Sequence, residues 1–160
     1  MKKLGWALVA VALVTGMGFL FAANAPAAET QEVRIYGAGT LTAQGDGIAI
    51  LGGKGAVDLS GNGILWVKDL AGDATIEVTG HGRKKVFPDG WVQYAGLHGT
   101  AHIAGTRIIV VLAGVNVELE AHGRGRAILW GHGTYQIDGQ TNEWRTGSGT
   151  HLRLAPRSAA

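Results

Sequence analysis

GAGTLTAQGDGIAILGGKGAVDLSGNGILWV, residues 37–67, is the stretch that decides the fold of this chain. An eight-residue frame, G-x-G-x-Φ-x-Φ-x with Φ standing for Leu, Ala or Val, begins at Gly37 and is repeated through the stretch. Every second residue from Val33 to Val67 is apolar or glycine. A period of two is typical of β-strands with one buried face, so the stretch predicts an all-β protein.

The G-x-G triplets have two interpretations. Asp46, Lys54 and Asn62 are the central residues of three triplets, and such residues suit exposed turns in which glycine takes a positive φ. A three-residue loop keeps the odd–even phase of its flanking strands, which explains why the phase does not slip. The alternative is one long strand that bends at each glycine pair. The sequence is compatible with both arrangements.

The remaining chain continues the β pattern. The apolar phase changes at residues 69–73 and moves to even positions from Ala74 to Gly82, which indicates a turn. Residues 87–91, FPDGW, predict a β-hairpin, because Pro presets φ for the turn and Gly accepts a left-handed conformation. Further strands are expected near Asp138-Gly139 and over residues 150–154.

The inward-facing set is expected to be small. The odd phase returns at Gly99 and runs to Ile137, so Ile109, Val111, Ala113 and Val115 are predicted to point inward. Gly, Ala, Val and Leu dominate the inward set, with Tyr135 as the one large residue, which predicts a thin core. Residues 48–51, 64–67, 107–115 and 127–130 are apolar on both faces, as is typical of strands covered on both sides.

We therefore expect one all-β domain of short antiparallel strands with G-x-G turns, forming a small barrel, roll or sandwich, with a β-solenoid as the alternative. Residues Gly45–Gly55 and Gly123–Gly133 share the motif G-x-G-x-A-I-L-x-G-x-G, which suggests duplicated β-units packed together. From Gly37 to Ile137 the chain resembles a group of short, uncharacterised exported bacterial proteins with Gly-rich G-x-G-x-L-x-A repeats. That resemblance implies a fold and no activity.

The N-terminal residues predict export. Two lysines precede an apolar stretch at residues 4–23, and the small-x-small pair Ala25 and Ala27 follows it. This pattern predicts a signal peptide at residues 1–28, with an uncleaved membrane anchor as the alternative. A Gly-rich domain then spans residues 29–155, and a disordered tail spans residues 156–160. We expect the protein to be periplasmic, on the cell surface or extracellular.

Charge and cysteine content exclude several classes of partner. The chain of 160 residues has 14 Lys and Arg against 12 Asp and Glu, and Lys2 and Lys3 belong to the signal peptide. The processed chain is therefore neutral, and we expect no nucleic-acid partner. With no cysteine, it cannot form disulfides or carry a lipoprotein cysteine.

Histidines offer weak candidates for a metal site. Imidazoles beside Glu118 and Glu120 on one sheet face could bind zinc or copper. The candidates fall on the outward phase: His98, His102, His122 and His132. The first two lie about 13 Å apart along a strand, too far for one ion without a turn. We therefore expect solvent-facing histidines and no cofactor.

No catalytic frame is present in the sequence. There is no cysteine and no G-x-S-x-G nucleophile motif, and no helix is expected after a G-x-G triplet, so the triplets are not phosphate loops. Four aspartates crowd one region: Asp46, Asp58, Asp69 and Asp73. Paired carboxylates can hydrolyse glycosides, but Asp is also common in turns for backbone reasons. We expect that the protein is not an enzyme.

Trp66 and Trp130 are weak candidates for ligand contact, because exposed aromatic rings stack on sugars or anchor a partner. The alternative is that both cap the outer layer of the core. The function we expect is that of a non-enzymatic exported envelope protein with a structural, adhesive or self-associating role. The alternative is a module that binds a polysaccharide or a small apolar ligand, and the third candidate is a hydrolase using acidic turn residues. Expected partners are a second copy or an envelope polysaccharide, and a membrane only through an uncleaved N-terminal segment.

Overall fold

The computed structural model describes residues 35–37 and 39–155. The chain divides into two compact units, Met1–Gln31 and Glu32–Ala160, and all described strands and core residues belong to the second. The described residues form seven strands and no helix, so they contain no helix that could cross a membrane. The expected signal peptide and C-terminal tail lie outside the described residues. The second unit therefore has a hydrophobic core of its own.

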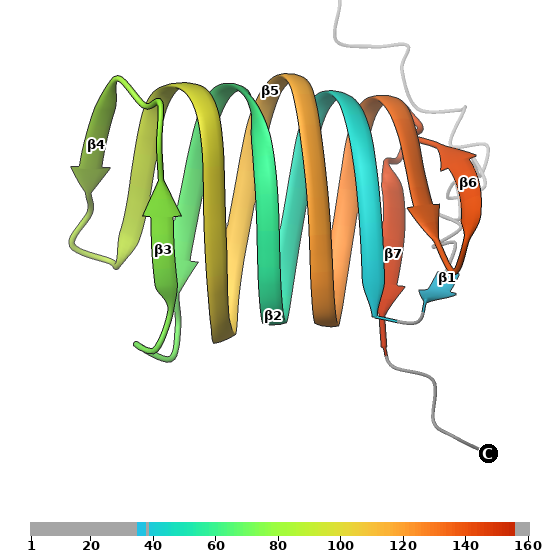
Figure 1. Ribbon diagram of the computed structural model, residues 1–160, viewed down its shortest axis with the longest axis horizontal. Coiled ribbons are helices and arrows are strands. Elements are labelled where there is room, and N and C mark those ends of the chain that lie inside the picture. The colour runs from blue at the N-terminus through green and yellow to red at the C-terminus, as the bar shows by residue number, and fades with distance from the viewer. Residues whose placement is uncertain (1–34, 38, 156–160) are drawn as a thin grey trace, which may run out of the picture. The chain divides into compact units, whose positions relative to one another are not determined.

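Two long strands make up most of this unit (Figure 1). β2 (Thr40–Asp69) and β5 (Trp91–Ile137) wind together as an antiparallel pair. Leu41 of β2 pairs with both Ala121 and Ile137 of β5, which lie sixteen residues apart. At this point one turn of the coil takes sixteen residues of β5, the length of two eight-residue frames. Bulges lengthen other turns, since Val57 pairs with both Ile103 and Ala121, which lie eighteen residues apart. Each pass of β2 lies between two passes of β5, and the sheet does not close into a barrel.

This arrangement confirms the all-β, antiparallel, single-domain prediction. The expectation of short strands closing into a barrel is wrong, because β2 has 30 residues, β5 has 47, and the sheet stays open. Of the two interpretations of the G-x-G triplets, the structure has the long strand that bends at each glycine pair. Strand pairing continues through the triplets at Gly45–Gly47 and Gly53–Gly55, which are corners of the coil. Because the chain bends there without turning back, the same odd positions stay inside from one frame to the next. Each turn of the coil has two straight segments between corners, so the outward side chains form two opposite faces.

The corners need glycine because neighbouring turns approach closely there. Gly47 pairs with Gly131, and a Cβ on either residue would overlap a backbone carbonyl oxygen of the facing strand. Their φ angles of 145° and 146° are also ones that side-chain-bearing residues rarely adopt. Glycine faces glycine at other corners as well: Gly45 and Gly133, Gly53 and Gly125, Gly55 and Gly123, Gly63 and Gly114.

The two copies of the eleven-residue motif pair with each other. The pairing runs antiparallel from Gly45 opposite Gly133 to Gly55 opposite Gly123, with Ile50 opposite Ile128 near its middle. Because the motif has a G-x-G triplet at each end, antiparallel pairing places glycine against glycine at both corners. The internal similarity of the sequence thus corresponds to a direct contact between neighbouring turns.

Five short strands finish the two ends of the coil. β3 (Thr75–Val78) and β4 (Arg83–Val86) pair with the start of β5. β6 (Gln140–Glu143) and β7 (Thr150–Leu154) pair with its later turns, and β1 (Ile35–Gly37) adds to β7 in parallel.

Two local predictions are confirmed at these ends. The hairpin at residues 87–91 joins β4 to β5, and its turn closes when the Gly90 N–H donates to the Phe87 carbonyl at 3.0 Å. Strands also follow Asp138-Gly139 and cover residues 150–154, as expected.

The predicted phase is wrong over part of β5. Ile108, Val110 and Leu112 are buried there, and the expected odd-numbered residues between them point outward. The cause is two bulges, each of which adds one residue to β5: Gly53 and Gly55 oppose Ile108 and Gly105, and Gly45 and Gly47 oppose Val117 and Gly114. The pattern hid this change because both parities are apolar in residues 108–113.

The core also holds more large residues than the sequence indicated. Tyr94 and Trp144 are buried along with Tyr135. Most other core positions are aliphatic, and several are fully covered: Leu41, Leu65, Leu112 and Leu129. Leu and Ile side chains from the two sides of the coil therefore fill the space that the glycine corners enclose.

The corner contact can be tested with one pair of variants. Gly47→Ala should lower the free energy of unfolding by about 3 kcal/mol, because it adds both a forbidden φ and a backbone overlap. Gly52→Ala is the matched control in the same strand, since the nearest contact of its Cβ would be the Ile108 carbonyl oxygen at 3.9 Å. Urea unfolding followed by circular dichroism measures both. If both variants lose the same free energy of unfolding, the close approach of glycines at the corners does not stabilise the coil.

Candidate functional site: two opposite faces of the coil

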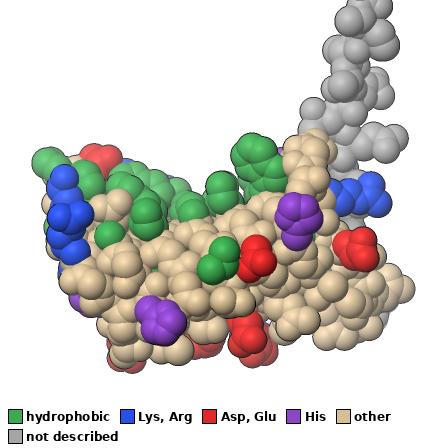
Figure 2. Space-filling view, turned by 90° about the horizontal axis from the view of Figure 1, so that it is seen from above, with side chains coloured by type: hydrophobic (Ala, Val, Ile, Leu, Met, Phe, Trp, Pro, Cys, Tyr) green, Lys and Arg blue, Asp and Glu red, His purple; other side chains and the backbone are tan. Residues whose placement is uncertain are grey.

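The outward side chains of the coil lie on two faces of different chemistry. Ile50 lies between Val111 and Ile128 on one face, and Thr42 lies between Glu120 and Gln136 on the other. Side chains of paired residues share a face, so the register assigns the whole set. The apolar face comprises the outward residues Ile48, Ile50, Ile64, Trp66, Trp91, Ile109, Val111, Ala113, Ile128 and Trp130. Figure 2 shows hydrophobic side chains gathered along one hollowed side and a group of acidic side chains along the opposite side.

An aromatic cluster covers one end of the apolar face. Trp66 stacks on Phe87 with ring centroids 5.2 Å apart, and Trp91 meets it edge-on at 6.2 Å. Lys68 Nζ lies 5.5 Å from the centre of the Trp91 ring, and Lys85 Nζ lies 4.5 Å from that of Phe87. Trp66 is therefore half-buried under the hairpin. Cations lie against the aromatic rings that cover it, in the geometry of cation–π contacts.

The exposed apolar residues lie along one edge of the apolar face, the row in which Ile64, Ala113, Ile48 and Trp130 pair across neighbouring strands. Trp130 is 54% exposed, and its indole N–H donates to the Thr146 carbonyl, which fixes the ring. Ile64 is 40% exposed, and Val115, at a neighbouring bulge, is 50% exposed. The structure thus separates the two candidate tryptophans: the hairpin covers Trp66, whereas Trp130 has no such cover.

The two faces carry opposite charge. On the apolar face and its β4 and β7 margins, the register places five cations: Lys68, Arg83, Lys85, Arg126 and Arg153. The described residues put no carboxylate there except Asp89 at the tip of the hairpin. On the polar face the register places five carboxylates: Asp58, Glu77, Glu118, Glu120 and Glu143. That face has no Lys or Arg among its described residues.

The polar face forms a broad, open groove of about 770 Å³ lined by hydroxyl, amide and carboxylate side chains. Two histidines pair with carboxylates on this face. His102 Nδ1 lies 2.6 Å from Asp58 Oδ1, and His122 Nε2 lies 2.9 Å from Glu120 Oε1. Each pair is partly exposed, so water competes with both contacts.

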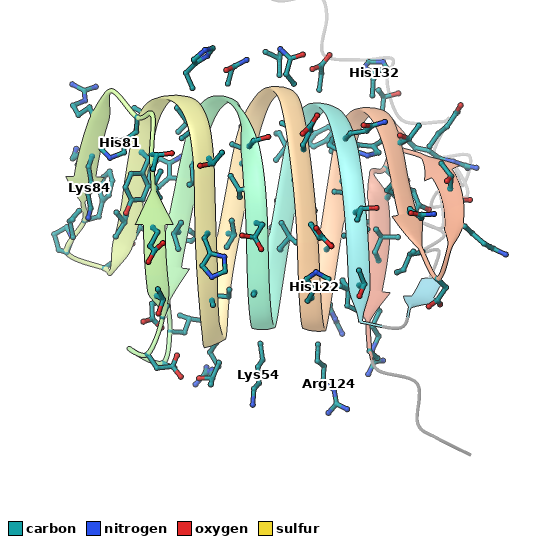
Figure 3. All side chains as sticks on the ribbon, viewed as in Figure 1. Lys54, His81, Lys84, His122, Arg124 and His132 are labelled. Atoms are coloured by element: carbon teal, nitrogen blue, oxygen red, sulfur yellow. The ribbon has the colours of Figure 1, made fainter. Side chains whose placement is uncertain are left out.

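The four histidines of the weak metal hypothesis do not come together. His98 and His132 pair with the corner residues Asn62 and Asp46, on an edge between the faces. His122 lies on the face of the coil, and His132 lies at its edge (Figure 3). The described part of the chain has no group of three or more His, Asp or Glu side chains placed to hold a metal ion.

Three of the four aspartates of the hydrolase hypothesis accept hydrogen bonds from the backbone. The Asp46 carboxylate accepts the N–H of Asn116 at the bulge, at 2.7 Å. The Asp69 carboxylate accepts the N–H groups of Ala71, Gly72 and Ala74 in the loop after β2. Asp73 accepts both the N–H and the hydroxyl of Thr106. These contacts give the three aspartates structural roles.

The loop contacts also shift two ionisation equilibria. The N–H of Ala74, followed by those of Gly72 and Ala71, holds the pKa of the Asp69 carboxyl below its ordinary value. The hydroxyl of Thr106 does the same for the pKa of Asp73, and the Thr106 N–H adds to it. Hydrogen bonds to the charged form explain both directions.

Comparison of the chain with protein-family models, with curated proteins and with solved structures finds no match in any of the three. The resemblance inferred from the glycine repeat therefore stays a prediction.

The sequence analysis did not group Phe87, Trp91 and the Lys and Arg residues on one surface, the apolar face. The signal was present: outward residues of alternate frames belong to the same face once the triplets are taken as corners. Residues 48, 50, 64 and 66 are apolar, whereas residues 42, 44, 58 and 60 are polar. A two-frame period in the outward residues would have separated the faces.

The pH dependence of stability follows from the aspartate contacts. Because the folded-state pKa of Asp69 lies below 3.8, its contribution is complete above that pH and is lost as the pH falls through the lowered value. Asp69→Asn should therefore be less stable than the unmodified protein at about pH 6, and the difference should shrink toward about pH 2. Melting temperatures across this range measure it. Asp89→Asn is the control, since Asp89 accepts one backbone bond at 3.4 Å. A constant difference at all pH values would contradict the assignment.

Proposed function

We propose that this chain is a non-enzymatic exported protein of the cell envelope that acts by adhesion through its apolar face. The observation that supports this most directly is the solvent exposure of Trp130, Ile64 and Val115 beside a half-buried aromatic cluster. Large contiguous apolar patches are rare on soluble monomers and mark interaction sites. Tryptophan held in a fixed orientation is also typical of residues that dominate binding energy.

Export is part of the proposal. The N-terminal pattern predicts a signal peptide, and the absence of cysteine is compatible with folding outside the cytoplasm without disulfides. The described part of the chain is held together by strand pairing, core packing and glycine corners, without disulfides. An envelope location places the apolar face near membranes and surface polymers.

Adhesion through a face fits better than end-to-end assembly of the coil. The described strands that end the coil are all short. β4 (Arg83–Val86) has three consecutive cations and β6 (Gln140–Glu143) is polar, whereas β1 (Ile35–Gly37) and β3 (Thr75–Val78) also carry apolar residues. Short, charged edge strands prevent pairing with another sheet. The ends of the coil therefore disfavour polymerisation by strand addition, and the apolar face is left as the adhesive surface.

A second candidate function is binding of a polysaccharide in the groove of the polar face. The groove offers hydroxyl, amide and carboxylate groups over about 770 Å³, as a glycan requires. The exposed tryptophan lies on the opposite face, however, so this groove lacks the aromatic platform on which sugars stack. We therefore rank it below adhesion.

Adhesion can be tested with isolated bacterial envelopes. Residues 29–160 should sediment with them, and Trp130→Ser should weaken the apparent affinity about thirtyfold, because an aromatic anchor contributes about 2 kcal/mol. Leu70→Ser is the matched control, since Leu70 is 44% exposed but lies in the loop after β2. A protein that stays in the supernatant, or a control that weakens binding equally, would refute the proposal.

The polysaccharide candidate has a different readout. A glycan in the groove should shift the imidazole resonance of His102, which lines it, in an NMR titration and leave the Trp130 indole resonance unchanged. Shifts confined to the indole resonance would place any glycan on the apolar face and exclude the groove.

A further inference from the structure

We propose that the partner of the apolar face is the surface of a lipid bilayer that contains anionic lipid. This inference rests on the proposed adhesive function and specifies its partner. From the sequence, a membrane contact was expected only through an uncleaved N-terminal segment. The structure supplies a second route that needs no such segment, because it lies wholly within the unit Glu32–Ala160.

The apolar residues fit the interfacial region of a bilayer. Trp66, Trp91 and Trp130 occupy one face together with Ile and Val side chains. Tryptophan is enriched at membrane–water interfaces, where its apolar body and polar N–H meet both environments. The hydrophobic side of the unit is hollowed, with apolar side chains on the raised parts as well as between them (Figure 2). Raised apolar side chains can enter the headgroup layer first.

The cations on this face specify the charge of the partner. Lys68 and Lys85 lie over aromatic rings of the cluster, and Arg83 shares the face with Lys85 on β4. Arg126 lies two residues before Ile128 on β5, toward the other end of the face. Cations thus accompany the apolar patch at both of its ends. Each Lys or Arg near an anionic lipid surface contributes about 1 kcal/mol of attraction.

The opposite face fixes the orientation. Its carboxylates, such as Asp58, Glu77 and Glu118, would be repelled by an anionic surface. Since the processed chain has no net charge, attraction to a membrane depends on this separation of charge between the faces. The acidic face is therefore expected to point away from the bilayer.

A second copy of the chain is a poorer occupant. Pairing two apolar faces would bring their cations together with only Asp89 to compensate them. Stacking the apolar face on the polar face of another copy would pair opposite charges. It would also bury Thr, Ser and Gln side chains against Ile and Trp, and unsatisfied polar groups are costly. A bilayer with anionic headgroups matches both the apolar and the charged parts of the face.

The test is co-sedimentation of residues 29–160 with vesicles of phosphatidylcholine alone or of phosphatidylcholine mixed with phosphatidylglycerol. Binding to the anionic vesicles should be at least about tenfold tighter and should weaken as salt is raised. The double variant Arg83→Glu/Lys85→Glu should lose at least about tenfold in affinity for them. The control, Lys54→Glu/Arg124→Glu, makes the same charge change at a corner where both side chains point away from the coil (Figure 3). That control should bind like the unmodified protein.

The outcomes separate this inference from the proposed function. Sedimentation with whole envelopes but not with anionic vesicles would overturn the lipid partner and leave adhesion standing. Failure to bind either would overturn both. Equal binding to neutral and anionic vesicles, equal losses in the two double variants, or a dimer that excludes vesicles would also overturn the lipid inference.

Discussion

The close approach of facing glycines at the corners is the constraint on which the rest of the structure depends. A Cβ at Gly47 or Gly131 would overlap a backbone carbonyl of the neighbouring strand. Strands can bend this sharply without losing their pairing only where no side chain stands between the turns. Glycine pairs at fixed spacing therefore set both the length of each side and the stacking of one turn on the next. The coil is a consequence of that spacing, since two strands with these bends and one inward face can pair through every corner.

One repeat also creates two surfaces. Because a turn takes two frames, outward residues of successive frames alternate between the faces, and the residues of each face can differ without any change in the inward set. Ile50 and Asp58 occupy corresponding outward positions one frame apart, yet one joins the apolar face and the other the polar face. The separation of five cations from five carboxylates follows from this alternation. The fold therefore supplies an amphipathic surface from a nearly uniform core.

The sequence predicted the strand class, the hairpin and the inward set of β2, because alternation and turn chemistry are local properties. It could not predict the phase around Val110, where both parities are apolar and the choice depends on two bulges. The bulge at Asn116 has a positive φ of 52° and is fixed by Asp46, seventy residues away. The grouping of Trp66 with Trp130 on one face likewise depends on the triplets being corners and not turns. Both the inward phase of β5 and the grouping of outward residues on one face are determined by the pairing of β2 with β5.

The apolar face is not needed to complete the core. Residues such as Leu41, Leu65 and Leu129 are fully covered by the coil itself, so the described unit buries its interior without a partner. Ile64 and Trp130 nevertheless stay exposed. Thr40, three frames before Ile64, and His122, one frame before Trp130, show that polar residues fit the same outward positions. Exposed apolar residues raise the risk of aggregation, and cations beside them reduce that risk while attracting anions. An apolar surface that folding does not require, edged by charge of one sign, therefore supports the proposed contact with an anionic amphipathic surface.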